Sequence, residues 1–150
     1  MGWLELGNPR EAIEELKQVS RRSEKTPEVM DAWWMIHAHV KDWNAALEVA
    51  RQYVKTHPDD ASGWIHQSYA LHEMKQTGDA FDLLSSVATR FPETGVIPYN
   101  IACYACQLGD KEQAISWIKR AMKIDGVSKV KARALQDDDL VPIKSDILKI

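Results

Sequence analysis

The sequence predicts an all-α fold in which antiparallel helix pairs stack as repeats. Alanine falls at positions 12, 46, 80 and 114, a spacing of 34 residues each time. Apolar residues follow each alanine at offsets that mark one face of a helix. The last three of these helices run towards a proline or a glycine, at Pro58, Pro92 and Gly126. A fixed period of this length is typical of stacked supersecondary units, so a second helix must precede each alanine-containing one.

The first alanine-containing helix is expected near residues 9–23. The run Asn8-Pro9-Arg10-Glu11 fits an N-cap, a proline at the first helical position and a capping-box glutamate. Residues 1–8 supply only a short stub before this helix, so the first repeat is partial.

The partner helices of the later repeats are expected between the turn signals. Thr26-Pro27 opens the first of them, and "HPDD" (57–60) and "FPET" (91–94) each end one helix and start the next. Asp110 follows Gly109 as a further N-cap. Three stretches are long enough for the partner helices and have apolar residues at helical spacing: 28–40, 62–75 and 96–108.

The C-terminal stretch "VKARALQDDDLVPIKSDILKI" begins like another first helix and is expected to break at Pro142. We expect it to cap the preceding helix as an irregular terminal unit. The run Asp137-Asp138-Asp139 is interpreted as a helix cap in preference to a cation site.

A helix–turn–helix unit of this period resembles the tetratricopeptide repeat. The stretch "GDKEQAISWIKRAMKID" (109–125) is the closest match to the family's second helix. The other residues that carry the resemblance are the alanine column, Trp64, Leu71, Leu84 or Ile118, and Pro58 or Pro92.

The resemblance covers about residues 1–128 and implies a right-handed superhelix of antiparallel helix pairs. The amino-acid sequence of residues 63–73, 97–109 and 134–143 also resembles that of small bacterial tetratricopeptide proteins to which no activity or ligand is assigned. The whole chain, 1–150, is predicted to be one domain: partial repeat 1–26, repeats 27–60, 61–94 and 95–128, and a C-terminal capping segment 129–150.

One position departs from the family pattern. The family prefers a small residue where paired helices cross, and Ser68 and Ala102 satisfy this preference, whereas Trp34 does not. Repeat 27–60 is therefore expected to open its crossing angle to admit the indole. Of the adjacent Trp33 and Trp34, one is expected in the core and the other at the junction with the first repeat. His66 is expected to face a neighbouring turn or solvent.

In the family, the first helix of each pair lines a concave groove. The resemblance therefore implies a partner-binding groove whose residues come from three first helices: Asp31, Met35, Ala38 and His39; Ile65, Tyr69, His72 and Glu73; Tyr99, Cys103, Cys106 and Gln107.

The charge pattern restricts what such a groove can bind. All 19 basic residues lie outside 27–40, 61–74 and 95–108, and the net charge is −3. A carboxylate clamp needs cations on the first helices, and nucleic acid needs a basic stripe. We therefore expect a protein or peptide partner with an apolar or mildly basic segment, whose basic side chain Asp31 or Glu73 would receive, and no nucleic acid.

An enzyme or metal site is the alternative interpretation of Cys103 and Cys106. These residues share a helix face, with His72 and His39 one and two repeats earlier, and zinc takes such ligands. Helices pack about 8–10 Å apart, so a Cys pair with one His is conceivable, whereas all four residues cannot converge. Cys103 also lies inside its helix, away from the helix N-terminus typical of redox cysteines and without free amides for an oxyanion site. We therefore expect a non-catalytic chain without a cofactor or metal.

Other sequence features bear on setting and assembly. No stretch approaches the length of a membrane span, and the N-terminus lacks the features of a signal peptide. Two cysteines so close together cannot join distant parts of the fold, so a reducing, cytoplasmic setting without membrane contact is expected. A short N-terminal stub would leave a repeat end bare, which makes a homodimer or homo-oligomeric scaffold the alternative function.

Overall fold

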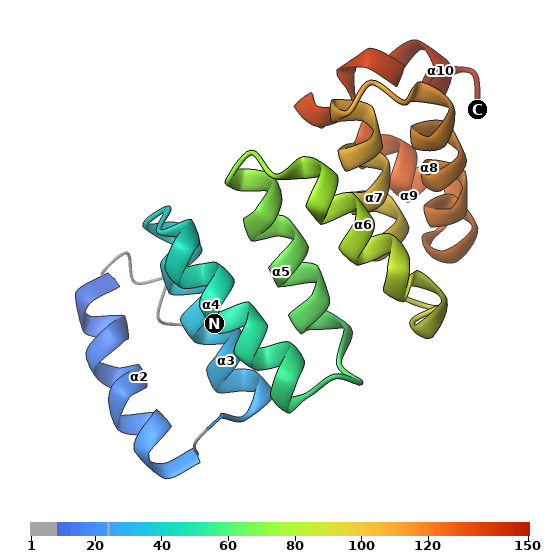
Figure 1. The fold of residues 1–150 in the computed structure, drawn as a ribbon. Helices are drawn as coiled ribbons and strands as arrows, with labels where there is room; N and C mark the ends of the chain where they lie inside the picture. The colour runs from blue at the N-terminus through green and yellow to red at the C-terminus, as the bar shows by residue number, and fades with distance from the viewer. Residues whose placement is uncertain (1–8, 24) are drawn as a thin grey trace. The chain divides into compact units, whose positions relative to one another are not determined.

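The computed structural model describes residues 9–23 and 25–150, and all regular structure in these residues is helical (Figure 1). The predicted all-α fold is confirmed. None of the described helices is long and apolar enough to cross a membrane. The helices are α2 (Pro9–Ser23), α3 (Pro27–His39), α4 (Trp43–Thr56), α5 (Ala61–Glu73), α6 (Thr77–Val87), α7 (Val96–Gln107), α8 (Lys111–Asp125), α9 (Val127–Ala134) and α10 (Lys144–Leu148), with 3-10 helices η1 (Ala88–Arg90) and η2 (Asp138–Ile143).

The chain forms two compact units, one ending at Met74 and the other running from Lys75 to Ile150. Unit 1 contains α2 to α5, and unit 2 contains α6 to α10. The boundary falls inside the repeat predicted at 61–94, whose two helices belong to different units. The single domain and the repeat boundaries stay predictions.

Side chains at the helix N-termini explain where several helices begin. Each cap satisfies a backbone amide of the first turn, which has no partner inside the helix. The cap predicted at Asn8 lies outside the described residues. The observed caps are Thr26 to the amide of Val29 (3.4 Å), Asp42 to Ala45 (3.2 Å), Asp60 to Ser62 (2.9 Å) and Asp110 to Gln113 (3.1 Å).

In unit 1, the alanine column lets neighbouring helices approach closely. Ala12 and Leu16 of α2 are buried against α3, and Trp33 packs against the same cluster. Trp33 therefore lies at the junction with the first repeat, as predicted.

A β-carbon at Gly63 of α5 would lie 3.1 Å from the Tyr53 ring of α4, so the two helices meet where only glycine fits without a shift.

Tyr53 also ties the end of α4 to the start of α5. Its hydroxyl donates to Asp60 Oδ2 at 2.8 Å, and burial followed by this hydrogen bond raises the pKa of Tyr53. Burial works to raise the pKa of Asp60, but hydrogen bonds from Ser62 and Tyr53 outweigh it and hold the pKa below its usual value. Asp60 is therefore ionised at neutral pH and serves both as cap and as acceptor.

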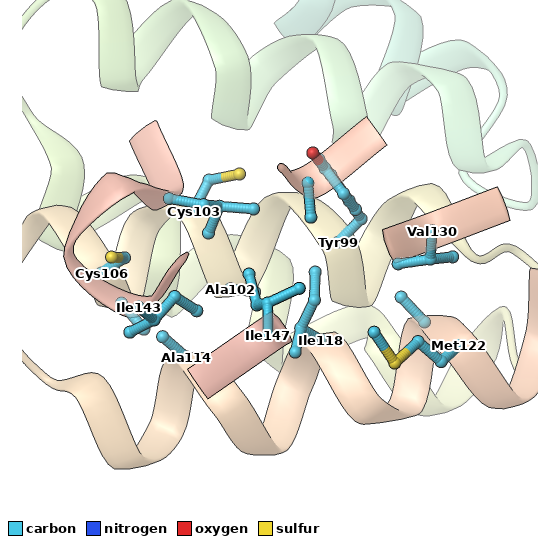
Figure 2. Close-up of a cluster of buried hydrophobic side chains, with 14 residues drawn as sticks. Tyr99, Ala102, Cys103, Cys106, Ala114, Ile118, Met122, Val130, Ile143 and Ile147 are labelled. Carbon is cyan, nitrogen blue, oxygen red and sulfur yellow. The ribbon is translucent and has the colours of Figure 1, made fainter. Parts of the chain in front are cut away.

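In unit 2, the C-terminal residues complete the core around α7 and α8 (Figure 2). Ala102 is fully buried, as the small residue predicted at a close crossing should be. We call residues 127–150 the C-terminal segment. Its buried side chains are Val130 and Ala134 of α9, Leu140 and Ile143 of η2, and Ile147 of α10.

The predicted helix break at Pro142 is wrong. Helix α9 ends at Ala134, and Pro142 lies inside η2. The chain leaves the helix earlier, and Asp137 Oδ1 then accepts the amide of Asp139 at 3.0 Å where η2 begins. The prediction that the aspartate run caps a helix is confirmed, and the helix that it caps is η2.

Candidate functional site

The predicted groove residues of unit 1 lie on α3 and α5, and we call their surface the α3/α5 face. Met35 and Tyr69 are exposed large side chains, at 36% and 39% of their full accessibility. His39 is also exposed, whereas the remaining residues are half-buried: Asp31, Ala38, Ile65, His72 and Glu73.

Three aromatic rings meet at this face: Trp34 of α3, Trp43 at the start of α4 and Tyr69 of α5. The ring centroids are 6.4 Å apart for Trp34–Trp43, 5.9 Å for Trp34–Tyr69 and 5.8 Å for Trp43–Tyr69. Trp34 is buried at 6% exposure, and its indole N–H has no hydrogen-bond partner among the described residues. We call these three residues the aromatic cluster. It joins α3, α4 and α5 through ring contacts, which favour tilted and edge-to-face geometries.

His66 fixes Asp31 at the same face. The imidazole stacks on Trp34 with centroids 4.1 Å apart and an interplanar angle of 15°. Its Nε2 lies 2.7 Å from Asp31 Oδ1. The prediction that His66 faces a turn or solvent is wrong, because the Trp34 indole fills the crossing position and offers a flat ring to α5.

The predicted groove residues of unit 2 lie on α7. The C-terminal segment covers Tyr99, Cys103 and Cys106 (Figure 2), whereas Gln107 is exposed. Tyr99, Cys103 and Cys106 are 3%, 5% and 4% exposed. Figure 2 shows the two cysteines and Tyr99 among the packed side chains of this core. An open groove wall at these residues, as predicted, is therefore not what the structure shows.

Polar contacts hold the C-terminal segment against α7. The Tyr99 hydroxyl donates to Asp137 Oδ2 at 2.8 Å, and the Arg133 guanidinium lies 4.0 Å from the centre of the Tyr99 ring. The Gln107 side-chain amide donates to the backbone carbonyl of Asp139 at 2.9 Å. The first helices carry no basic residue in sequence, but here the C-terminal segment brings a cation onto α7.

The cysteines are poorly suited to thiolate chemistry. Burial, followed by the charges of Asp137 and Asp139, raises the pKa of Cys103, and burial followed by Asp139 raises that of Cys106. The thiolate is the nucleophile and the metal ligand, so protonated thiols are inert at neutral pH.

The arrangement around Cys103 differs from the Cys–Cys–His site weighed from the sequence. Its sulfur and carboxylate oxygens of Asp137 and Asp139 lie within 4.8 Å of one another. The Cys103 thiol points at Asp137 Oδ2, 3.9 Å away, which is the geometry of a weak hydrogen bond. The cluster therefore works as a polar contact between α7 and η2.

Two surface grooves lie away from every predicted site residue. The first, of about 940 Å³, is formed by the start of α3 and the second half of α4, with Met30, Trp33 and Val49 among its lining residues. The second, of about 430 Å³, lies along α8. The repeat register did not predict either groove, because no lining residue is among the concave-groove positions that it assigns to the first helices.

Solved structures with a similar fold include a tetratricopeptide-repeat protein and several MamA proteins. TTC0263, a thermophilic TPR protein of Thermus thermophilus, is 15% identical with a TM-score of 0.73 and covers 98% of this chain and 94% of its own. MamA from Desulfovibrio magneticus RS-1, from its residue 41 to the end, is 20% identical with a TM-score of 0.70 over 97% and 85%. MamA of MSR-1 is 18% identical with a TM-score of 0.67 over 84% and 72%.

These similarities establish the fold. The chain has the all-α tetratricopeptide-repeat fold that its period predicts. No family model matches the sequence, and no curated protein matches it. What the chain binds must therefore be argued from its own surfaces.

Proposed function

We propose that the chain is a non-catalytic protein-interaction module whose α3/α5 face binds an apolar or mildly basic peptide segment of a partner protein. Helical repeats commonly present an extended surface to protein partners. The observation that supports this function is the aromatic cluster of Trp34, Trp43 and Tyr69. It lies at a face formed by α3 and α5, and neither helix contains a lysine or an arginine.

The exposed part of this face suits apolar side chains. Tyr69 and Met35 offer a rigid ring and an adaptable thioether, both frequent at peptide-binding surfaces. Trp34 and Trp43 hold the Tyr69 ring from behind, at 5.9 and 5.8 Å. A preordered ring loses little conformational entropy when a peptide packs on it.

The same face can receive one basic side chain. The Asp31 side chain is 36% exposed, and a carboxylate accepts hydrogen bonds at both oxygens, so it can bind a lysine or arginine while it holds His66. Aromatic faces attract a nearby cation as well. An acidic peptide would find no lysine or arginine on α3 or α5 to meet it.

The predicted groove residues on α7 are not part of the binding site proposed here. A partner could reach Tyr99, Cys103 or Cys106 only if the C-terminal segment moved away, whereas Gln107 is already exposed. Their role in binding stays a prediction, and the site proposed here is confined to unit 1.

The test is titration of the full chain with a short peptide of leucines around one central lysine, followed by tryptophan fluorescence. Trp34 and Trp43 lie in the site and report directly. Tyr69→Ala should weaken binding by about tenfold or more, as loss of a central aromatic anchor does. Val40→Ala, which removes an exposed apolar side chain (52% exposed) at the end of α3, is the matched control and should leave the affinity unchanged.

Charge variants of the peptide make the test specific. Replacing the central lysine by glutamate should weaken binding, and Asp31→Asn should remove the preference for lysine over alanine. Stronger binding of peptides with acidic C-termini, abolished by amidation of those termini, would disprove the proposal.

One observation favours self-association as a second function. The exposed large apolar side chains near the C-terminus are Val141, Leu148 and Ile150, at 56%, 58% and 40%. Apolar repeat ends favour association with another copy. Sedimentation of the wild type and of Leu148→Lys tests this, and a monomer mass independent of concentration would exclude it. The predicted contribution of the N-terminal stub falls on residues 1–8, outside the described residues.

A further inference from the structure

The α8 groove has the shape of a small binding site. It measures about 430 Å³, within the range of roughly 300–1,000 Å³ that is typical of ligand pockets. The residues that line it come from the end of α6, from η1, the loop before α7, α7 itself and α8, and they include Phe91, Trp117, Arg120, Lys123 and Ile124.

An aromatic residue is held in place within this groove. The Trp117 indole N–H donates to Gln113 Oε1 at 3.4 Å, and the Arg120 guanidinium lies 4.3 Å from the centre of the Trp117 ring. Trp117 is half-buried and packs against the core of unit 2. Together with Phe91 and Ile124, it gives the groove an apolar wall fixed before any ligand arrives.

All the ionisable side chains that line the groove are cationic. They are Arg120 and Lys123, and no aspartate or glutamate is among the lining residues. A third cation lies beside the groove, since the Arg90 guanidinium is 5.6 Å from the centre of the Phe91 ring. Within residues 9–23 and 25–150, neither Arg120 nor Lys123 has a carboxylate oxygen within 4.0 Å. Arg120 and Lys123 therefore place positive charge, without a paired carboxylate among the described residues, next to an apolar wall.

Unit 1 has a groove at the corresponding position of the repeat, but its lining residues differ in charge. Two repeat periods earlier, Val49 takes the place of Trp117 and Gln52 takes the place of Arg120, and both line the 940 Å³ groove of unit 1. That groove is also lined by Glu48, Lys25 and His57, so it carries charges of both signs. A groove at this position is thus common to both units, whereas the combination of an aromatic ring with purely cationic charge is found only in the groove of unit 2.

We infer that the α8 groove is a second docking site, which binds an acidic peptide segment of a partner protein. An apolar side chain of that segment packs on Trp117 and Phe91, while flanking carboxylates meet Arg120 and Lys123. Arginine suits this role because its planar fork pairs with a carboxylate while its face stays on an aromatic ring. This site has the opposite charge preference to the α3/α5 face, so the two can hold different segments.

The test uses the full chain and a fluorescein-labelled short peptide with one leucine between aspartates and glutamates. Fluorescence anisotropy gives its affinity, and the same peptide with asparagine and glutamine in place of the acids is the neutral comparison. The double variant Arg120→Glu/Lys123→Glu should weaken the acidic peptide by about tenfold or more, and Trp117→Ala should weaken both peptides.

The chain offers a matched control for charge. Lys111→Glu/Lys119→Glu makes the same change in net charge on the same helix, at exposed residues that do not line the groove. This control should change the affinity by less than about threefold, the residual expected from screened long-range charge. Thermal unfolding followed by circular dichroism verifies that both double variants are folded.

Four outcomes would overturn the inference. They are equal weakening by the two double variants, equal affinity for the neutral peptide, tighter binding of a short oligothymidylate than of the acidic peptide, and a dimer mass that only Arg120→Glu/Lys123→Glu abolishes. The last would make the occupant a second copy of this chain. None of these results bears on the α3/α5 face, whose test uses a basic peptide and Tyr69.

Discussion

Helices α3 and α7 occupy the same position in the repeat, two periods apart, but they meet different surroundings. Met35 of α3 and Cys103 of α7 fall in one column of the repeat, and Met35 is 36% exposed whereas Cys103 is 5% exposed. The difference comes from the C-terminal segment, which packs on α7 and presents Asp137 to the Tyr99 hydroxyl. The repeat register predicts which residues can face a groove. Whether those residues are exposed depends on the sequence beyond the repeats, which can cover them.

The largest effect is expected from removing the apolar anchor of the C-terminal segment. Ile143 is fully buried, whereas Val141, two residues earlier in η2, is 56% exposed. Ile143→Ala should lower the free energy of unfolding by about 2–5 kcal/mol, because it leaves a cavity in the core. Val141→Ala, the control, should change it by less than about 0.5 kcal/mol. Urea unfolding followed by circular dichroism measures both, and equal small losses would contradict the covered state of α7.

A smaller loss should follow from removing the polar contact between η2 and α7. Asp137 accepts the Tyr99 hydroxyl, lies 3.9 Å from the Cys103 thiol and caps η2. Asp137→Ala should cost about 1–3 kcal/mol, because it leaves a buried hydroxyl without its acceptor. It should also speed the reaction of Cys103 with a thiol reagent.

Asp138→Ala tests whether position in the acidic run matters. Asp138 is exposed and adjacent in sequence, so its removal should alter neither the stability nor the thiol reaction rate appreciably. Fast thiol reaction in the wild type would show that α7 is already uncovered.

The fold could be predicted from the sequence because its signal is periodic. The alanine column, Thr26, Asp60 and Asp110 each act locally, through helix packing or capping, and local rules transfer between repeats. The covering of Tyr99, Cys103 and Cys106 could not be read in this way. It depends on Asp137 and Ile143, which lie outside the repeat and have no column to compare with.

The site in unit 1 shows the same limit. Tyr69 and Asp31 were placed on the α3/α5 face from the repeat register, but the stacking of His66 on Trp34 was missed. Trp34 breaks the small-residue rule at the helix crossing, and that departure was the available signal that α5 must present a flat partner. The register alone gave no reason to choose His66.

Alkaline pH should test whether Cys103 is covered in solution. Burial raises the pKa of Cys103 above its ordinary value of 9.0, so the folded state keeps a proton that the unfolded state releases. Below about pH 9, titration of Cys103 does not change the free energy of unfolding. Above about pH 9, this thiol lowers the free energy of unfolding by about 1.4 kcal/mol per pH unit. Cys103→Ala should remove that share of the slope in urea unfolding between about pH 9 and 10. An unchanged slope would place the thiol in solvent.

The smallest effect concerns the turns that join the paired helices. Lys41 and Gly109 fall in one column and both adopt left-handed backbone, with φ of 59° and 84°. Lysine is strained in this region by about 1–2 kcal/mol, and glycine is not. A β-carbon at Gly109 would meet nothing within 4 Å, so Gly109→Lys tests conformation without a steric clash.

Gly109→Lys should lower the free energy of unfolding by about 1 kcal/mol or less, because the strain is partly offset by the smaller entropy of the unfolded lysine chain. Lys41→Gly should raise it by a similar amount. Gly78 lies in α6 and also has nothing within 4 Å of an added β-carbon, so Gly78→Ala, the control, should stabilise the protein by up to about 1 kcal/mol. Urea unfolding measures all three, and a stabilising Gly109→Lys would mean that the left-handed turn of α7 and α8 is not kept in solution.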